Sequence, residues 1–349
     1  MLVKSLKLNN YRNYTSRVVN FDSGLNLIIG KNGIGKTNIL ESLVVVSNTK
    51  SFRTLDDTNL IKIGEEYAGI ECQSDTSKYK VVISKNGKRL YINDVPVKKT
   101  SEFIGSLNCV LFKPSDLDIF NHSPKERRRL LDVEIGKVSK KYLNSILEYN
   151  LLLKDKNRLL KEEKIDHTYL SLIEEKMIPD IKEIISQREE FLELINTYIS
   201  DIYQNISNEK SKISIIYKKC SDKDKVKEMI EKSHDKDLYY HYATYGPHHD
   251  DYEIMMNDHL LEEIASQGQT RMVLISFKLA LIKYIESKTG NTPVLLLDDI
   301  LSELDTANKE RLLKLIPQSI QIIITGTDLN GMNLKTKYKL IELKEGENV

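Results

Sequence analysis

Apolar side chains recur with two different spacings along this chain, and the change of spacing marks its main divisions. In residues 1–30 and again in 67–100, apolar and polar residues alternate, which is typical of half-buried strands. From Pro124 to about Ile206 the apolar residues recur every three or four positions, which predicts helices. Residues 294–297 are continuously apolar and predict a buried strand of a parallel sheet. The pattern indicates an α/β protein that carries a separate helical segment.

Two apolar stripes at helical spacing lie within that segment. The first stripe consists of Tyr142, Ile146, Tyr149, Leu152 and Leu153, and the second of Leu170, Ile173, Met177, Ile181 and Ile184. The charged stretch 161–166 between them predicts a turn, so we expect two long antiparallel helices with charged residues on the wet face. Pro179 predicts a kink in the second helix. Residues 207–245 are polar and poorly periodic and predict no particular element.

A hairpin is expected where residues 79–84 and 89–93 flank the stretch 85–88. Both flanks are rich in residues that favour strands. The Asn86-Gly87 pair between them fits a type I′ turn. A small antiparallel sheet is therefore predicted, and the lysines at its tip are more simply solvated than bound to a ligand.

Composition narrows the class of protein. The chain has 349 residues, with 52 Lys and Arg against 51 Asp and Glu, so its net charge of +1 predicts no global basic field for nucleic acid. Three scattered cysteines, Cys72, Cys109 and Cys220, form neither a disulfide framework nor a zinc pattern. The sequence has neither a signal peptide nor an apolar run long enough to span a membrane. We expect a cytoplasmic protein with no membrane partner.

A phosphate-binding loop lies between a predicted strand at 25–29 and a predicted helix at 38–46. Gly30, Gly35, Lys36 and Thr37 fill the pattern G-x-x-x-x-G-K-[ST]. Backbone N–H groups of the loop and the helix N-terminus attract phosphate, Lys36 adds a cation, and Thr37 offers a hydroxyl to Mg²⁺. The predicted ATP-binding residues of this stretch are Gly30, Lys31, Asn32, Gly33, Ile34, Gly35, Lys36, Thr37 and Asn38. A glycine turn that binds nothing is the alternative interpretation.

The strand at 294–297 ends in two carboxylates, Asp298 and Asp299, as a Walker B segment does. Asp298 is predicted to hold Mg²⁺, and Asp299 to act as the general base, with Lys36 as the second catalytic residue. The pair could instead cap the next helix. Asp299 is one methylene shorter than a glutamate, which predicts slow ATP turnover.

Other motifs extend this pattern to a family. Residues 266–269 (Ser-Gln-Gly-Gln), then the strand ending at Asp298, then 302–305 (Ser-Glu-Leu-Asp) resemble the signature, Walker B and D-loop of ABC-type ATPase heads. Further blocks resemble the RecF family of the SMC-like branch: 10–14, 33–41, 112–117, 123–132 and 246–251. These blocks follow the family order over nearly the whole chain.

The resemblance implies an ABC/SMC-type ATPase head with a mixed sheet around the P-loop and a small antiparallel sheet. That head would comprise 1–120 and 246–349, and an inserted helical lobe would comprise 121–245. Arg12 and Asn13 would lie near the nucleotide, and Ser266, Gly268 and Gln269 would cap the ATP of a second subunit. The chain departs from the family at His249, where Arg is usual, and Thr327 and Asp328 are weak site candidates.

In function, the resemblance implies a slow, DNA-dependent ATPase that dimerises with ATP and Mg²⁺ on gapped or junction DNA. It would act with RecR and RecO in helping to load RecA. The cluster 127–129 (Arg-Arg-Arg) is a candidate DNA contact or, equally, an intramolecular ion-pair cluster.

Two other functions share parts of the pattern. The alternative is the ATP-binding subunit of a membrane transporter, but Thr37 and Asp298 are farther apart in the chain than such a head needs. A structural SMC-type clamp with idle hydrolysis would need a longer coiled coil than the helical stripes provide.

Overall fold

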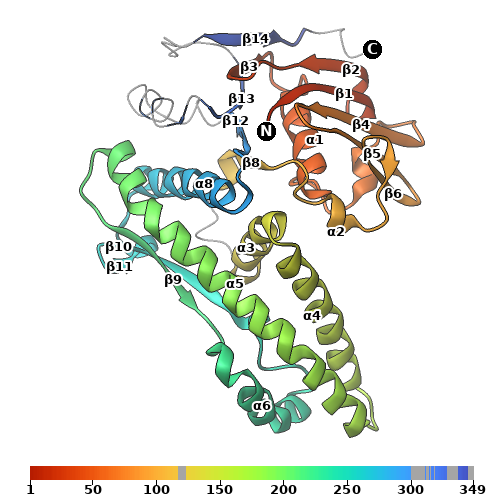
Figure 1. Cartoon of the computed structure of the whole chain (residues 1–349), viewed down its shortest axis with the longest axis vertical. Coiled ribbons are helices and arrows are strands. Elements are labelled where there is room, and N and C mark those ends of the chain that lie inside the picture. Colours follow the sequence, from red (N-terminus) through yellow and green to blue (C-terminus); the bar gives the residue numbers. More distant parts are fainter. Residues whose placement is uncertain are drawn as a thin grey trace. The chain divides into compact units, whose positions relative to one another are not determined.

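The computed structural model describes residues 1–116, 123–299, 311, 314, 316–317, 319–327 and 337–344. Its internal contacts divide the chain into two compact units, whose elements are labelled in Figure 1. The first unit comprises Met1–Leu117, Asp201–Glu209 and Arg271–Val349, and the second comprises Asp118–Ser200 and Lys210–Thr270. The resemblance implied a helical insertion at 121–245, whereas the second unit extends to Thr270.

Two sheets form the first unit. One has the strand order β14 (Tyr338–Glu342), β3 (Leu25–Ile29), β13 (Ile322–Gly326), β12 (Val294–Asp298), β8 (Cys109–Phe112), and all its described pairs are parallel. The other is antiparallel, in the order β2 (Tyr14–Asn20), β1 (Val3–Tyr11), β4 (Tyr67–Ser74), β5 (Lys78–Ser84), β6 (Gly87–Ile92), β7 (Val95–Pro96). The predicted α/β head is confirmed, and its antiparallel sheet also contains the N-terminal strands.

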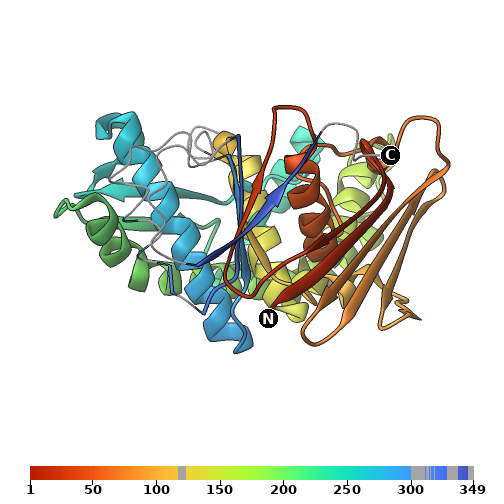
Figure 2. The ribbon, with the colours of Figure 1, turned by 90° about the horizontal axis from the view of Figure 1, so that it is seen from above.

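Helix α1 (Lys36–Asn48) lies between these two sheets (Figure 2). Its Ile39 and Leu43 belong to the same apolar cluster as Leu6 and Ile70 of the antiparallel sheet and Leu296 of the parallel sheet. Burial on both sides fixes the helix, and so fixes the loop that precedes it. The unit also contains η1 (Asp57–Leu60), α2 (Thr100–Phe103) and most of α8 (Gln267–Thr289).

The predicted type I′ turn at Asn86-Gly87 is wrong. Ser84 pairs with Gly87, so the loop residues are Lys85 and Asn86, and neither has the positive φ that this turn requires. Gly87 itself has φ 116°, which suits a turn followed by a bulge. A type I′ geometry occurs instead at 93–94, where Asn and Asp have φ of 51° and 64° between β6 and β7.

The helices of the second unit follow the expected pattern. They are α3 (Pro124–Val138), α4 (Lys140–Leu159) and α5 (His167–Ser207), the last of which continues into the first unit. Ion pairs Lys141–Glu183 at 2.6 Å and Lys156–Glu174 at 2.8 Å show that α4 and α5 run antiparallel. Helix α5 passes through Pro179 without interruption. Among the described helices, none is both long and apolar enough to cross a bilayer.

The stretch 207–245, which predicted no element, contains β9 (Ile213–Lys218), η3 (Lys223–Lys225) and α6 (Val226–Tyr240). After it come η4 (Pro247–His249), β10 (Asp251–Met256), β11 (His259–Leu260) and α7 (Leu261–Ile264). Strand β9 pairs with β10, from Ile213 opposite Met256 to Lys218 opposite Asp251. This pairing joins β10 to the second unit and explains why that unit extends beyond residue 245.

Candidate nucleotide-binding site

The glycine loop joins β3 to the start of α1, as the motif predicted. Gly35, the residue before α1, has φ 116° and no described side chain caps the helix there. A Cβ at this position would lie 2.6 Å from Tyr14 Oη and 2.8 Å from Asn13 Nδ2, so only glycine fits. A helix N-terminus without a side-chain cap, preceded by a glycine loop, is a ready site for phosphate.

Lys36 folds back over this loop. Its Nζ donates to the carbonyl oxygens of Gly30, at 2.5 Å, and Lys31, at 3.0 Å. Burial lowers the pKa of the Lys36 ammonium, although the nearby Asp299 and Asp298 carboxylates oppose this shift. Because carbonyls are weaker partners than anions, the ammonium is placed to exchange them for phosphate oxygens.

Asp298 and Thr37 meet, although they are 261 residues apart in the chain. Thr37 Oγ1 donates to Asp298 Oδ1 at 3.0 Å, and Thr325 Oγ1 donates to the same oxygen at 2.8 Å. Asp298 is only 7% exposed, and burial raises the pKa of its carboxyl, with the two hydroxyls only partly offsetting that rise. The site therefore holds a buried carboxylate that no described cation pairs with.

These atoms fit Mg²⁺ bound with a nucleotide. The threonine hydroxyl and the carboxylate are hard oxygen donors, and such sites complete the ion's shell with phosphate oxygens and water. The described residues contain no cluster of three or more His, Cys, Asp or Glu that would hold a metal by itself.

Asp299 follows the last residue of β12 in an unusual backbone conformation. Its φ is 52°, in the left-handed region that is rare for residues other than glycine. Its N–H donates to Thr325 Oγ1 at 3.1 Å, so a single hydroxyl contacts both aspartates. The sequence pattern did not single out Thr325, because it comes from β13 and meets the pair only through parallel pairing of β12 with β13.

Asn13 holds the loop from the side of the antiparallel sheet. Its Nδ2 donates to the carbonyl oxygen of Ile34 at 2.9 Å, and its Oδ1 accepts from Asn38 Nδ2 at 2.8 Å. These two hydrogen bonds allow the amide of Asn13 to fix the shape of the loop. Within the loop, Lys31, Asn32 and Gly33 are exposed and Ile34 is buried.

Arg12 is held by a residue that the sequence analysis missed. Its Nε and Nη2 donate to the two carboxylate oxygens of Glu41 at 2.8 and 2.6 Å, and its Nη1 donates to Asn59 O at 2.8 Å. Glu41 lies on α1, is fully buried, and also accepts from Ser51 Oγ at 2.6 Å. In the sequence, Glu41 is the last residue of the block 33–41, but no local pattern links it to Arg12.

The predicted signature residues lie at the start of α8, in the second unit. Ser266 Oγ accepts from the N–H of Gln269 at 3.2 Å, and Gln269 Oε1 accepts from the N–H of Ser266 at 2.9 Å. This reciprocal pair is a capping box. Gly268 leaves open space, because a Cβ there would contact only Ser266 Oγ, at 3.8 Å. The predicted D-loop at 302–305 and Asp328 lie outside the described residues.

A pocket of about 490 Å³ opens beside the P-loop in the first unit. Its lining includes Gly30, Lys31 and Ile34 of the loop and Leu343 after β14. Thr327, a weak candidate from the sequence, also lines it.

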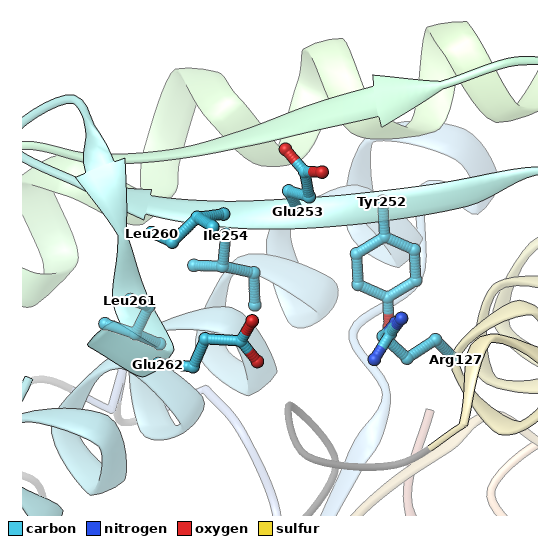
Figure 3. Close-up of a pocket in the computed structure, with 7 residues that line it drawn as sticks. All are labelled: Arg127, Tyr252, Glu253, Ile254, Leu260, Leu261 and Glu262. Atoms are coloured by element: carbon cyan, nitrogen blue, oxygen red, sulfur yellow. The ribbon is translucent and has the colours of Figure 1, made fainter. Parts of the chain in front are cut away.

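The three arginines at 127–129 differ in their surroundings. Arg127 Nε donates to Asp251 Oδ1 at 2.8 Å, and Arg128 Nη1 donates to the carbonyl oxygen of Asp250 at 2.6 Å. Figure 3 shows Arg127 beside Tyr252 at a small pocket of about 60 Å³. Arg129 is exposed. The ion-pair interpretation therefore describes Arg127, while Arg129 is the arginine that faces solvent.

His249 stands where the sequence comparison led us to expect an arginine. Its ring Nε2 lies 3.2 Å from the carbonyl oxygen of Ala243, and the ring of His248 lies beside it, with centroids 4.1 Å apart. The ring of His249 thus contacts the backbone of its own unit.

Three comparisons place the chain among known proteins. Residues 1–325 match the AAA ATPase domain family AAA_15. The chain is 37% identical to the DNA replication and repair protein RecF of Macrococcus caseolyticus, over 99% of both chains. It also resembles a solved structure of the recombination mediator protein RecF with ATP in the RecFOR pathway, with a TM-score of 0.88, 33% identity and coverage of 95% and 93%.

A more distant likeness concerns the fold alone. An Smc head bound to the C-terminal winged-helix domain of ScpA gives a TM-score of 0.56 at 18% identity, and covers 95% of this chain and 91% of that one. The predicted SMC-like head is thus confirmed as a fold.

Proposed function

The chain belongs to the RecF family of DNA replication and repair proteins, and from that premise we propose that it is an ATP-driven switch on DNA. ATP binding would close a homodimer on DNA, and slow hydrolysis would release it. The observation that carries the proposal is the contact of Thr37 with Asp298 at 3.0 Å, which joins the two halves of an ATPase site across 261 residues. The relatives named above are repair proteins, which disfavours the alternative of a transporter subunit.

Each residue of the site has a separate task in this proposal. Lys36 exchanges its carbonyl partners for phosphate oxygens, while the backbone of 30–38 surrounds the phosphates. Thr37 and Asp298 would hold Mg²⁺, which when bound neutralises phosphate charge. Asp299 accepts a proton from the attacking water as the general base. Asn13 holds the loop in the shape that receives the nucleotide. Arg12, which Glu41 holds in place, would lie near the nucleotide.

We expect slow ATP turnover because the side chain of the general base, Asp299, is short. A general base is effective only within hydrogen-bond reach of its proton, and an aspartate reaches one methylene less far than a glutamate. Its left-handed backbone, held by the N–H contact to Thr325, also fixes where the side chain starts. Such a site suits a switch better than a motor.

We propose that Ser266, Gly268 and Gln269 contact the ATP of the second subunit. A serine hydroxyl and the N–H groups at the start of α8 would form an anion site for the γ-phosphate of the second subunit's ATP. The position of the capping box supports this role, because Ser266 is exposed and Gln269 is half-buried.

The partner would be gapped or junction DNA, bound without sequence preference through phosphate contacts. With RecR, and indirectly with RecO, the bound dimer would help RecA to load. A DNA partner places this activity in the cytoplasm.

The test measures dimerisation and DNA release with the full chain. Size-exclusion chromatography with light scattering should show a dimer only with ATP, Mg²⁺ and gapped DNA. Asp299→Asn should keep the dimer, lower ATP turnover by about 10²–10⁴-fold and slow DNA dissociation. Lys36→Met should fail to dimerise. The matched control for Asp299→Asn is Asp258→Asn, which makes the same change at an exposed aspartate. A monomer under every condition would refute the switch, and unchanged DNA release by Asp299→Asn would refute release by hydrolysis.

A further inference from the structure

Three tyrosines lie exposed at the end of α6, in the second unit. Tyr239, Tyr240 and Tyr242 are 77%, 54% and 48% exposed, and we call them the tyrosine platform. The rings of Tyr239 and Tyr240 meet edge to face with centroids 5.0 Å apart, and those of Tyr240 and Tyr242 are 6.0 Å apart. Exposed aromatic rings contribute little to the hydrophobic core, so a cluster of them indicates a binding surface for a partner.

The base beneath the platform is rigid. Helix α6 ends at Tyr240 because His241 turns into the left-handed region with φ 59°. The His241 ring Nδ1 lies 2.9 Å from Leu160 O, and the N–H of Ala243 donates to Asn157 Oδ1 at 2.7 Å. Both partners are at the end of α4. The exposed rings therefore start from a backbone that is fixed on either side.

A basic groove adjoins the same anchor points. It has a volume of about 520 Å³ and is lined by Asn150, Leu153, Lys154, Asn157, Arg158 and Lys161. Asn157 thus belongs to the groove and also holds the backbone next to Tyr242. Arg158 pairs with Asp155 at 3.4 Å, but this pair is exposed and so is easily exchanged for another anion.

Acidic residues also lie in this part of the unit. Glu162 and Glu163 follow Lys161, and Asp235 precedes Lys236 on α6; all three are exposed. The buried acids Glu174 and Asp237 are compensated by Lys156, at 2.8 and 2.7 Å. Three basic residues line the groove and no acidic residue does. Its charge therefore complements phosphate.

We propose that the tyrosine platform and this groove bind single-stranded nucleic acid, with the tyrosines stacking on unpaired bases and Lys154, Arg158 and Lys161 contacting phosphates. The inference rests on the proposed DNA-binding function and deepens it. Unpaired bases expose the flat faces that aromatic rings stack on, whereas a double helix keeps those faces stacked inside. The platform would thus recognise the single-stranded side of a gap, independently of sequence.

The absence of tryptophan from the chain gives a direct probe. A Tyr240→Trp variant has a single indole, whose fluorescence should be quenched when an oligothymidylate of ~20 nucleotides stacks on it. Tyr67→Trp is the matched control, because Tyr67 is 52% exposed but lies on β4 of the first unit. Quenching of Tyr240→Trp by the single strand and not by a blunt duplex supports the proposal. Equal quenching of both reporters, or none of either, overturns it.

Replacement of the rings and of the charges should have separable effects. Changing all three platform tyrosines to Ser should weaken oligothymidylate binding at least about fivefold per stacked base, whereas changing all three to Phe should preserve it. Lys154→Gln, Arg158→Gln and Lys161→Gln together should reduce the salt slope by about 2. Equal loss in the Phe and Ser variants would indicate that tyrosine hydroxyls contact another protein, and would overturn stacking.

Failure here is distinguishable from failure of the proposed function. If ATP-dependent dimerisation on gapped DNA persists while Tyr240→Trp does not respond to single strands, only the platform proposal is wrong. If quenching occurs without ATP-dependent dimerisation, the switch is wrong and the platform stands.

Discussion

Two buried charged side chains, Arg188 in the second unit and Asp298 in the first, are treated in opposite ways. In the second unit, Arg188 is 2% exposed and donates to Asp132 and Asp250, both at 2.8 Å, and to the carbonyl oxygen of Pro247 at 2.9 Å. In the first unit, Asp298 accepts from two hydroxyls and pairs with no described cation. One set of charges is complete within the fold, and the other is complete only when a ligand binds.

The pKa shifts express the same contrast. Burial alone would lower the pKa of Arg188, but Tyr142, Asp132, Tyr217 and Asp250 together raise it well above its ordinary value. At the nucleotide site, burial lowers the pKa of Lys36 and raises that of Asp298, so each group is pushed toward its neutral form. Charges that serve the fold are stabilised in advance, whereas charges that serve a ligand remain costly until it arrives.

The largest expected effect is on stability, at Arg188. Arg188→Met leaves the buried Asp250 and the half-buried Asp132 without their cation, so the free energy of unfolding should fall by about 3–5 kcal/mol. Urea unfolding followed by circular dichroism measures this loss. Arg158→Met removes an exposed pair by the same change of side chain and should cost less than about 1 kcal/mol. Equal losses in the two variants would contradict the contrast between buried and exposed charges.

Lys36→Met should show the reverse of Arg188→Met, namely a loss of ATP binding without a loss of stability. Loss of a charged donor to phosphate should weaken ATP binding by about 10–100-fold. Stability without nucleotide should hold, because the ammonium makes only carbonyl contacts and is already disfavoured by burial. Calorimetric titration with ATP and urea unfolding test the two statements separately. A Lys36→Met chain that unfolds as readily as Arg188→Met would show that Lys36 belongs to the fold.

The sequence revealed the parts of the site that are contiguous in the chain. The strand, loop and helix around Gly35 and Lys36 occupy 25–48, so their pattern is local, and the apolar run before Asp298 marks its own strand. Thr325 and Glu41 escaped notice because their roles come from packing between distant segments. Glu41 lies in the block 33–41, but no local pattern links it to Arg12 or links Thr325 to Asp298.

The same reason explains the errors in the fold. Strand β9 is stabilised by β10, whose residues follow more than thirty positions later, so the polar stretch 207–245 shows little of the pairing in its own sequence. The hairpin around 85–88 is present, but its turn type was misassigned because Asn-Gly suits two kinds of turn, and the register of the flanking strands decides between them.

The Asp298→Asn variant tests the contrast between Arg188 and Asp298 through the pH dependence of stability. Because burial raises the folded-state pKa of Asp298, its ionised form costs stability above that raised value, and the cost vanishes below the unfolded pKa of about 3.9. Without nucleotide, the variant should therefore be more stable than the wild type at neutral pH, and the difference should disappear near pH 4.

Addition of Mg²⁺ and ATP should reverse that order, since only the wild type keeps the carboxylate for the metal. Melting temperatures of both chains from pH 4 to 8, with and without ligand, test both halves of the prediction. A wild type that is more stable at neutral pH without nucleotide would show that the hydroxyls of Thr37 and Thr325 compensate the charge fully.

The smallest effect on stability is expected at Ser266, where one side chain serves both the fold and a ligand. Ser266→Ala removes the N-cap of α8 and should cost about 1 kcal/mol, whereas Ser266→Asp replaces it with an equally good cap and should change stability by less than about 0.5 kcal/mol. The added carboxylate would nevertheless repel γ-phosphate presented by a second subunit. Light scattering with ATP and gapped DNA should therefore show Ser266→Asp as a stable monomer that still binds ATP. If Ser266→Asp dimerises as the wild type does, the capping box is the whole role of this residue, and the second subunit must complete the site with other groups.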